Sequence, residues 1–150
     1  MWTGSATGRH VVKFSASGQE LARTAVGRVD TPTAVANHDV MRLAVAGTRH
    51  VWAVRTAVGE LIKLSLAGEV LATYPLGGIL YDVVADADGN ALLANYTDNT
   101  VFAVAPDGTP LGHAAVPGWP FALVLDARGK LWVTSKQADK LTRFAVTAAP

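Results

Sequence analysis

The hydrophobic positions of this chain repeat with a period of about 40 residues. Trp2, Trp52, Leu92 and Trp132 occupy matching places in successive copies, at spacings of 50, 40 and 40 residues. A second apolar residue follows each of them after 12 residues, at Phe14, Leu64, Val104 and Phe144. Repeats of this length that consist of short strands are typical of propellers, in which each repeat forms one blade. The pattern therefore predicts a β-propeller architecture.

Each copy contains four apolar runs separated by turn residues. In the last copy Phe121 to Asp126 is almost continuously apolar, residues 127–130 form a turn, and Leu131 to Thr134 begins a second run. Third runs, such as Thr100 to Val104, alternate apolar and polar residues, and a fourth run is clear at Glu69 to Thr73. Continuous apolar character is expected of an innermost strand, and alternation of a half-buried one. Four antiparallel strands per repeat correspond to one blade.

Two residue types have expected structural roles within each copy. Asp86 and Asp126 precede glycine-containing turns, where a carboxylate usually accepts hydrogen bonds from the backbone of the turn. Trp52 and Trp132 begin the second strand, and we expect these large rings to fill the space between adjacent blades.

The phase of the repeat predicts an all-β propeller segment of about 3.5 four-stranded antiparallel blades. We expect one domain over residues 1–150, with a partial blade at 1–27, blades at 28–77 and 78–117, and a partial blade at 118–150. Incomplete blades expose strand edges and apolar faces. We therefore expect either a piece of a longer propeller or a subunit that closes a ring by self-association.

Composition narrows the classes of partner. Half of the residues are hydrophobic and 17% are charged, as expected of a packed domain. Thirteen basic and twelve acidic residues give a net charge of +1 without a run of like charges, which argues against nucleic-acid and membrane partners. Cysteine is absent, which excludes disulfides and thiolate metal sites. No leader or membrane-spanning stretch is visible, and the localisation stays open.

Binding residues are expected on the face where loops between second and third strands meet loops between blades, because loops on a rigid scaffold usually carry function. The candidates there for ligand binding are Tyr96, Asp98, Asn99, Trp119 and Lys136. Tyr81 and Phe121 belong to the same recognition hypothesis. Packing between blades is the alternative interpretation of the aromatic residues.

The 50-residue spacing contains ten extra residues, which we place in the connection between the first two blades. This insertion, around residues 28–39, adds Asp30, Asn37, His38 and Asp39 to the binding candidates. His38 is also a weak candidate for a catalytic base, although a solvated loop histidine is the simpler interpretation. An alternative alignment makes Pro32 to Ala36 the innermost strand and moves the insertion to the opposite face.

The stretch from Val116 to Ser135, followed by Lys140 to Phe144, resembles the repeat of NHL-type and virginiamycin B lyase-like β-propellers, and YVTN repeat propellers are similar. The resemblance extends over essentially the whole chain at the level of the repeat. It implies a propeller fold, but such blades occur in lyases, lactonases, sensors and protein-binding scaffolds, so it does not specify an activity.

The resemblance also implies where catalytic residues would lie. Virginiamycin B lyase-like propellers have an acidic residue after the Trp-x-Thr of the second strand, and His, Glu and a magnesium ion on the rim. Here Arg55, Asn95 and Ser135 occupy that place. Gluconolactonase-like propellers bind a divalent ion through Glu, Asn and Asp oxygen atoms. In this chain Asn95, Asp98, Asn99 and Asp82 are the residues that offer such atoms.

The residues themselves identify no metal site and no cofactor. The sequence favours a propeller scaffold that recognises a small molecule or a protein through the loops of one face. The alternative is a metal-dependent lyase or lactonase whose catalytic residues are partly missing from this chain, and only this alternative involves Mg²⁺ or Ca²⁺. The sequence does not distinguish an enzyme from a binding protein.

Overall fold

The computed structural model describes residues 1–5, 9–26 and 40–146. In these residues the chain is all-β, with short strands and one 3₁₀ turn, η1 (Thr56–Val58). The first two sheets contain β1 (Trp2–Gly4), β2 (His10–Phe14) and β3 (Glu20–Ala25), then β4 (Val40–Ala46), β5 (His50–Arg55), β6 (Glu60–Leu64) and β7 (Val70–Pro75). The last two contain β8 (Leu80–Ala85), β9 (Ala91–Asn95), β10 (Thr100–Val104) and β11 (Pro110–Ala115), then β12 (Pro120–Leu125), β13 (Lys130–Ser135) and β14 (Lys140–Ala145).

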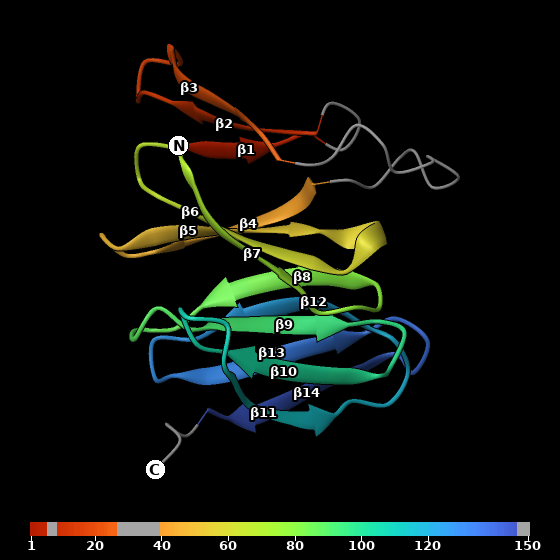
Figure 1. Ribbon diagram of the computed structural model, residues 1–150. Helices are drawn as coiled ribbons and strands as arrows, with labels where there is room; N and C mark the ends of the chain where they lie inside the picture. The colour runs from red at the N-terminus through yellow and green to blue at the C-terminus, as the bar shows by residue number, and fades with distance from the viewer. Residues whose placement is uncertain (6–8, 27–39, 147–150) are drawn as a thin grey trace.

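Each sheet is an antiparallel meander in which every strand pairs with its neighbours in sequence. The first and second sheets appear as separate layers in Figure 1, whereas the strands of the third and fourth sheets overlap in this view. The innermost strands of consecutive sheets contact each other, β4 against β8 and β8 against β12. Sheets arranged in this way, with first strands toward a common axis, are propeller blades. The predicted fold class and the four-strand repeat are therefore confirmed.

The position of β4 resolves the two alignments of the long spacing. This strand is the innermost of its sheet and pairs with β5, so that Ala44 lies opposite Trp52. The extra residues therefore precede β4, in the connection between the first two sheets, and the alternative that used Pro32 to Ala36 as the innermost strand is wrong. The candidates Asp30, Asn37, His38 and Asp39 lie outside the described residues.

The turns between first and second strands are capped as predicted. Asp86 accepts hydrogen bonds from the backbone N–H groups of Asp88 and Asn90, both at 2.9 Å. Asp126 does the same for Arg128 at 2.8 Å and Lys130 at 2.9 Å. These bonds fix the hairpin by satisfying turn donors that would otherwise face solvent.

In the part of the chain that the structure describes, three hydrophobic clusters form the core, one between each pair of consecutive sheets. Trp52 is fully buried in the cluster between the second and third sheets. Its Nε1 donates a 2.9 Å hydrogen bond to the carbonyl of Gly89 in the next sheet. The predicted role of Trp52 between blades is confirmed.

Trp132 differs from Trp52 in its surroundings. It is only half-buried, and its Nε1 bonds to Asp126 of its own sheet at 3.0 Å. The guanidinium of Arg143 lies 5.5 Å from its ring centroid. Among the described residues, the hydrogen bond and the cation–π contact of Trp132 both stay within its own sheet. They do not match the prediction that its ring packs between adjacent blades.

No helix among the described residues is long and apolar enough to cross a membrane.

Candidate functional site

The connections that follow second strands lie at one end of the stacked sheets. The η1 turn after β5 and the turn between β9 and β10 both lie at the right of Figure 1. Both turns end in a residue with a left-handed backbone, Gly59 at φ 62° and Asn99 at φ 54°. Gly and Asn tolerate this conformation better than most residues. The first and last sheets have Arg9 at φ 52° and Asp139 at φ 48° in the matching place.

Four aromatic side chains form a continuous row at this end of the third and fourth sheets. Tyr81 of β8 contacts Tyr96 and Phe121, with ring centroids 4.9 Å apart in each pair. Tyr96 in turn contacts Trp119, at 5.1 Å. All four rings are half-buried, and none belongs to the three hydrophobic clusters. The row therefore presents aromatic surface outside the packing between blades.

Trp119 is held in an unusual backbone conformation. Its φ of 61° lies in the left-handed region, which a bulky residue rarely adopts and which costs free energy. Its N–H donates to Oδ1 of Asn99 at 2.8 Å, and its carbonyl accepts from the N–H of Lys136 at 3.0 Å. The preceding Gly118, at φ 80°, leaves no room for a side chain, because a Cβ there would lie 2.5 Å from that of Ala138. Contacts to two neighbouring turns thus fix the backbone that carries the indole.

Polar groups flank the aromatic row. Lys136 is exposed, and its Nζ lies 5.7 Å from the Phe121 ring centroid. In the turn after β9, Asp98 accepts a 2.8 Å hydrogen bond from Nδ2 of Asn95. Oδ1 of Asn95 accepts from the N–H groups of Thr97 and Asp98, so this turn is rigid. The structure brings together the predicted Tyr96, Asn99, Trp119 and Lys136, and Asp98 lies in the same turn as Tyr96 and Asn99.

The structure adds Arg42 and Asp82, which sequence reasoning did not combine. They occupy the same position of β4 and β8, 40 residues apart, and the Arg42 Nε lies 3.5 Å from Oδ1 of Asp82. Asp82 is buried, and Oδ2 accepts the N–H of Leu123 in β12 at 2.8 Å. Burial raises the pKa of Asp82, while the hydrogen bonds and Arg42 act in the opposite direction. Asp82 thus links its own blade to the blades of Arg42 and Leu123. The sequence signal for this link was a carboxylate inside the otherwise apolar strand β8.

In the described part of the chain, the residues that the lyase and lactonase resemblances implicate have hydrogen-bond partners, with the exception of the Ser135 hydroxyl. Arg55 is buried and donates a 2.6 Å hydrogen bond to Oε2 of Glu60. The buried hydroxyl of Ser135 has no hydrogen-bond partner among the described residues. Oδ1 of Asn95 and Oδ2 of Asp98 accept hydrogen bonds within their turn, Oδ1 of Asn99 accepts from Trp119, and the two oxygen atoms of Asp82 accept from Val83 and Leu123. Among the described residues, no three His, Cys, Asp or Glu side chains are grouped as they would be to hold a metal ion.

Comparison with known proteins supports the fold. No protein-family profile matches the chain, and no curated protein matches it. Solved structures do: virginiamycin B lyase from Staphylococcus aureus has a TM-score of 0.74 at 9% identity, over 97% of this chain and 52% of that one. A streptogramin B lyase has a TM-score of 0.74 at 18% identity, over 97% of this chain and 50% of its own.

A third similar structure is BamB from Moraxella catarrhalis, with a TM-score of 0.69 at 15% identity over 95% of this chain and 39% of that one. The chain thus spans about half the length of the two lyase structures that it matches. At these identities the similarity establishes a propeller fold and no activity.

Proposed function

We propose that this chain is a recognition scaffold that binds a small molecule through the aromatic row formed by Tyr81, Tyr96, Trp119 and Phe121. The ligand that fits this row has a planar aromatic ring and an anionic group. The contiguous stacking of the four half-buried rings outside the core carries the proposal.

The row suits ring recognition for two physical reasons. Aromatic side chains offer a large contact area and prefer offset or tilted stacking with a further ring, worth about 0.5–1.5 kcal/mol per pair beyond area burial. The backbone at Trp119 is fixed by Asn99 and Lys136, so little conformational entropy is lost when a ligand stacks on it. Backbone strain at a bulky residue also favours a functional explanation over a purely structural one.

Lys136 is the reason for proposing an anionic group on the ligand. Its ammonium group lies over Phe121, at the end of the row opposite Trp119, and is exposed. Among the described residues, no carboxylate forms an ion pair with it. A ligand ring stacked on the row therefore places a carboxylate within reach of a free cation, where a charge-assisted hydrogen bond adds affinity and orientation.

The experiment is a titration of the ¹⁵N-labelled chain with N-acetyltryptophan, which has a ring and a carboxylate, and with the neutral N-acetyltryptophan amide. We expect both to shift the indole Nε1–H signal of Trp119, with the carboxylate binding more tightly. Trp119→Asn should abolish both interactions while the fold persists, because Asn tolerates the left-handed backbone.

Lys136→Gln should weaken only the carboxylate compound, by about threefold to tenfold. Lys130→Gln, at the other end of β13, is the matched control and should leave both affinities unchanged. Saturable binding that is insensitive to Trp119→Asn, or no binding at all, would refute the proposal.

The metal-dependent lyase or lactonase alternative makes a different prediction: Mg²⁺ or Ca²⁺ would raise the melting temperature more than Na⁺ at equal ionic strength.

A further inference from the structure

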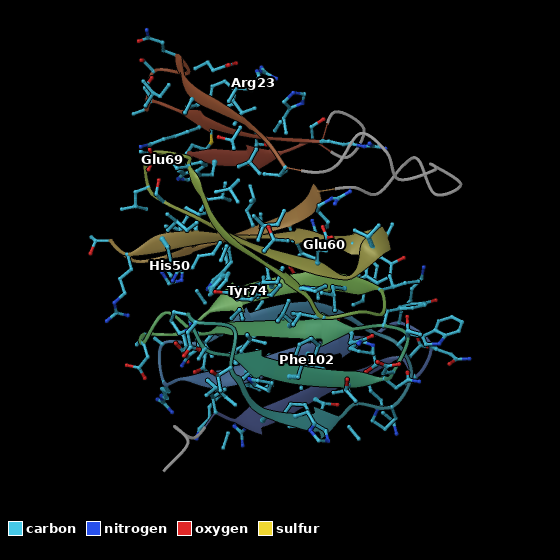
Figure 2. The ribbon with its side chains drawn as sticks, viewed as in Figure 1. Arg23, His50, Glu60, Glu69, Tyr74 and Phe102 are labelled. Atoms are coloured by element: carbon cyan, nitrogen blue, oxygen red, sulfur yellow. The ribbon has the colours of Figure 1, made fainter. Side chains whose placement is uncertain are left out.

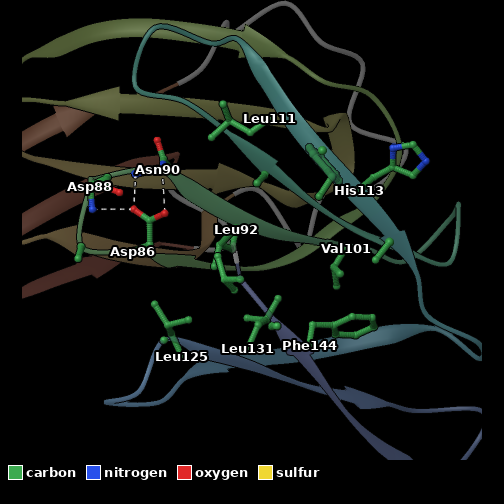
Figure 3. Close-up of a pocket in the computed structure, with 18 of the residues that line it drawn as sticks. Asp86, Asp88, Asn90, Leu92, Val101, Leu111, His113, Leu125, Leu131 and Phe144 are labelled. Atoms are coloured by element: carbon green, nitrogen blue, oxygen red, sulfur yellow. Dashed lines mark hydrogen bonds between the residues drawn. The ribbon is translucent and has the colours of Figure 1, made fainter. Parts of the chain in front are cut away.

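The interface between the third and fourth sheets contains a cavity of about 520 Å³. Leu92, Val101 and Leu111 line it from the third sheet, and Leu131 and Phe144 from the fourth (Figure 3). Cavities of about 300–1,000 Å³ with mainly apolar walls are the usual size and character of small-molecule sites.

The preceding interface, between the second and third sheets, is filled by three large side chains. Trp52 bonds to the Gly89 carbonyl, and both Lys63 and Tyr74 reach the carbonyl of Pro106, at 2.8 and 3.1 Å. Tyr74 lies between these two sheets in Figure 2, against the backbone of Gly108. This interface shows how the repeat closes the space between blades.

One repeat later, the same three positions have smaller side chains. Leu92, Ala103 and Ala114 stand 40 residues after Trp52, Lys63 and Tyr74, and all three line the cavity. Replacing large residues by small ones at a packed interface leaves a void unless the sheets close on it. The cavity is therefore a local departure of the sequence from its own repeat.

Acidic side chains outnumber basic ones at the cavity. Its lining includes Asp86, Asp88 and Asp126 against the single basic residue His113, and the guanidinium of Arg49 bonds to the Ala87 carbonyl beside Asp88. Asp86 and Asp88 gather with Asn90 at one end of the apolar walls (Figure 3). Asp86 is used as a turn cap, whereas Asp88 is exposed and no cation among the described residues pairs with it. Ala103 occupies the position in the third sheet that Lys63 has in the second sheet, so no lysine at this position offsets the carboxylates.

We infer that this cavity is a second binding site, separate from the aromatic row, for an amphipathic cation. Its apolar or aromatic body lies between Leu92, Ala114 and Leu131, and its ammonium group lies at the acidic end near Asp88. Apolar burial supplies most of the affinity and the carboxylates select the charge. This inference does not depend on the function proposed for the aromatic row.

The test uses three fluorescent naphthalene compounds of equal ring size: 1-naphthylmethylamine as the cation, 1-naphthalenemethanol as the neutral analogue and 1-naphthoate as the anion. We expect the cation to bind the full chain most tightly and the anion most weakly. Asp88→Asn should weaken the cation by about threefold to tenfold and leave the alcohol unchanged, because an exposed charge pair has a modest effect.

Two variants fill the cavity with residues that the repeat already accommodates at the previous interface. Leu92→Trp and Ala114→Tyr should each lower affinity for the amine and the alcohol at least tenfold, without a loss of melting temperature. Ala115→Tyr is the matched control, since residue 115 is exposed and does not line the cavity. Trp119→Asn should have no effect, which separates this site from the aromatic row.

Unchanged binding in both filled variants, binding lost in Trp119→Asn, or a preference for the anion would each overturn the inference. If one filled variant does not fold, the other decides the matter. Failure here leaves the N-acetyltryptophan titration unaffected, because the two sites use different residues.

Discussion

Replacing Trp52 by Leu, the residue that the next repeat has at this position, tests how the blades are held together. Trp52 is fully buried, and its Nε1 bonds across the interface to Gly89. Its ring meets that of His50 at 4.8 Å in an edge arrangement and that of Tyr74 at 6.2 Å. All of these interactions are absent with Leu.

The magnitude follows from three contributions. Loss of the hydrogen bond costs about 1 kcal/mol, since His50 Nε2 still reaches the Gly89 carbonyl at 3.1 Å. Loss of the aromatic contacts costs about 1 kcal/mol. The smaller apolar area and the residual cavity cost about 1–2 kcal/mol. We therefore expect the free energy of unfolding to fall by about 3–4 kcal/mol, a large share of the roughly 5–15 kcal/mol typical of a domain.

The matched control is Trp132→Leu, the same change at the same position of the repeat. Trp132 is half-buried and bonds within its own sheet, so its loss should cost only about 1–1.5 kcal/mol. Urea denaturation of both variants, followed by far-UV circular dichroism, measures the difference. Equal losses, or a larger loss for Trp132→Leu, would refute the conclusion that Trp52 binds adjacent blades together.

Two further predictions concern single positions. Gly108→Ala should destabilise the chain by about 2–3 kcal/mol in the same denaturation assay, because a Cβ would lie on the Tyr74 ring and the backbone has φ 93°; an unchanged midpoint would contradict this packing. Because burial raises the pKa of Asp82, the folded state binds a proton more tightly than the unfolded state, so this group favours folding as the pH falls through its folded-state pKa. The unfolding free energy of the wild type minus that of Asp82→Asn should therefore increase from pH 7 to pH 4, and a flat or opposite trend would contradict the assigned environment.

The repeat made the fold predictable. A large apolar residue at the start of each second strand, aspartates before glycine-containing turns, and an apolar first strand each report a local requirement of a blade. Asp86 and Asp126 cap their turns as expected, and Trp52 packs between sheets, because these roles depend on neighbours in the sequence or in the adjacent repeat.

The candidate site was predictable only in part. Tyr96, Trp119 and Lys136 were found because topology brings their loops to one face. The stacking of Trp119 on Tyr96 depends on the left-handed backbone at Trp119. The sequence does not indicate this conformation, because tryptophan rarely adopts it. Comparing each repeat with its neighbour would have revealed the cavity, since Ala103 and Ala114 replace Lys63 and Tyr74, but its volume depends on how closely the sheets approach.

The most direct test of ligand recognition by the aromatic row is a measurement of intermolecular nuclear Overhauser effects between bound N-acetyltryptophan and the protein. We expect contacts from the indole protons of the ligand to the ring protons of Tyr96 and Trp119. Contacts confined to Leu92 and Leu131, or to residues outside both sites, would contradict it.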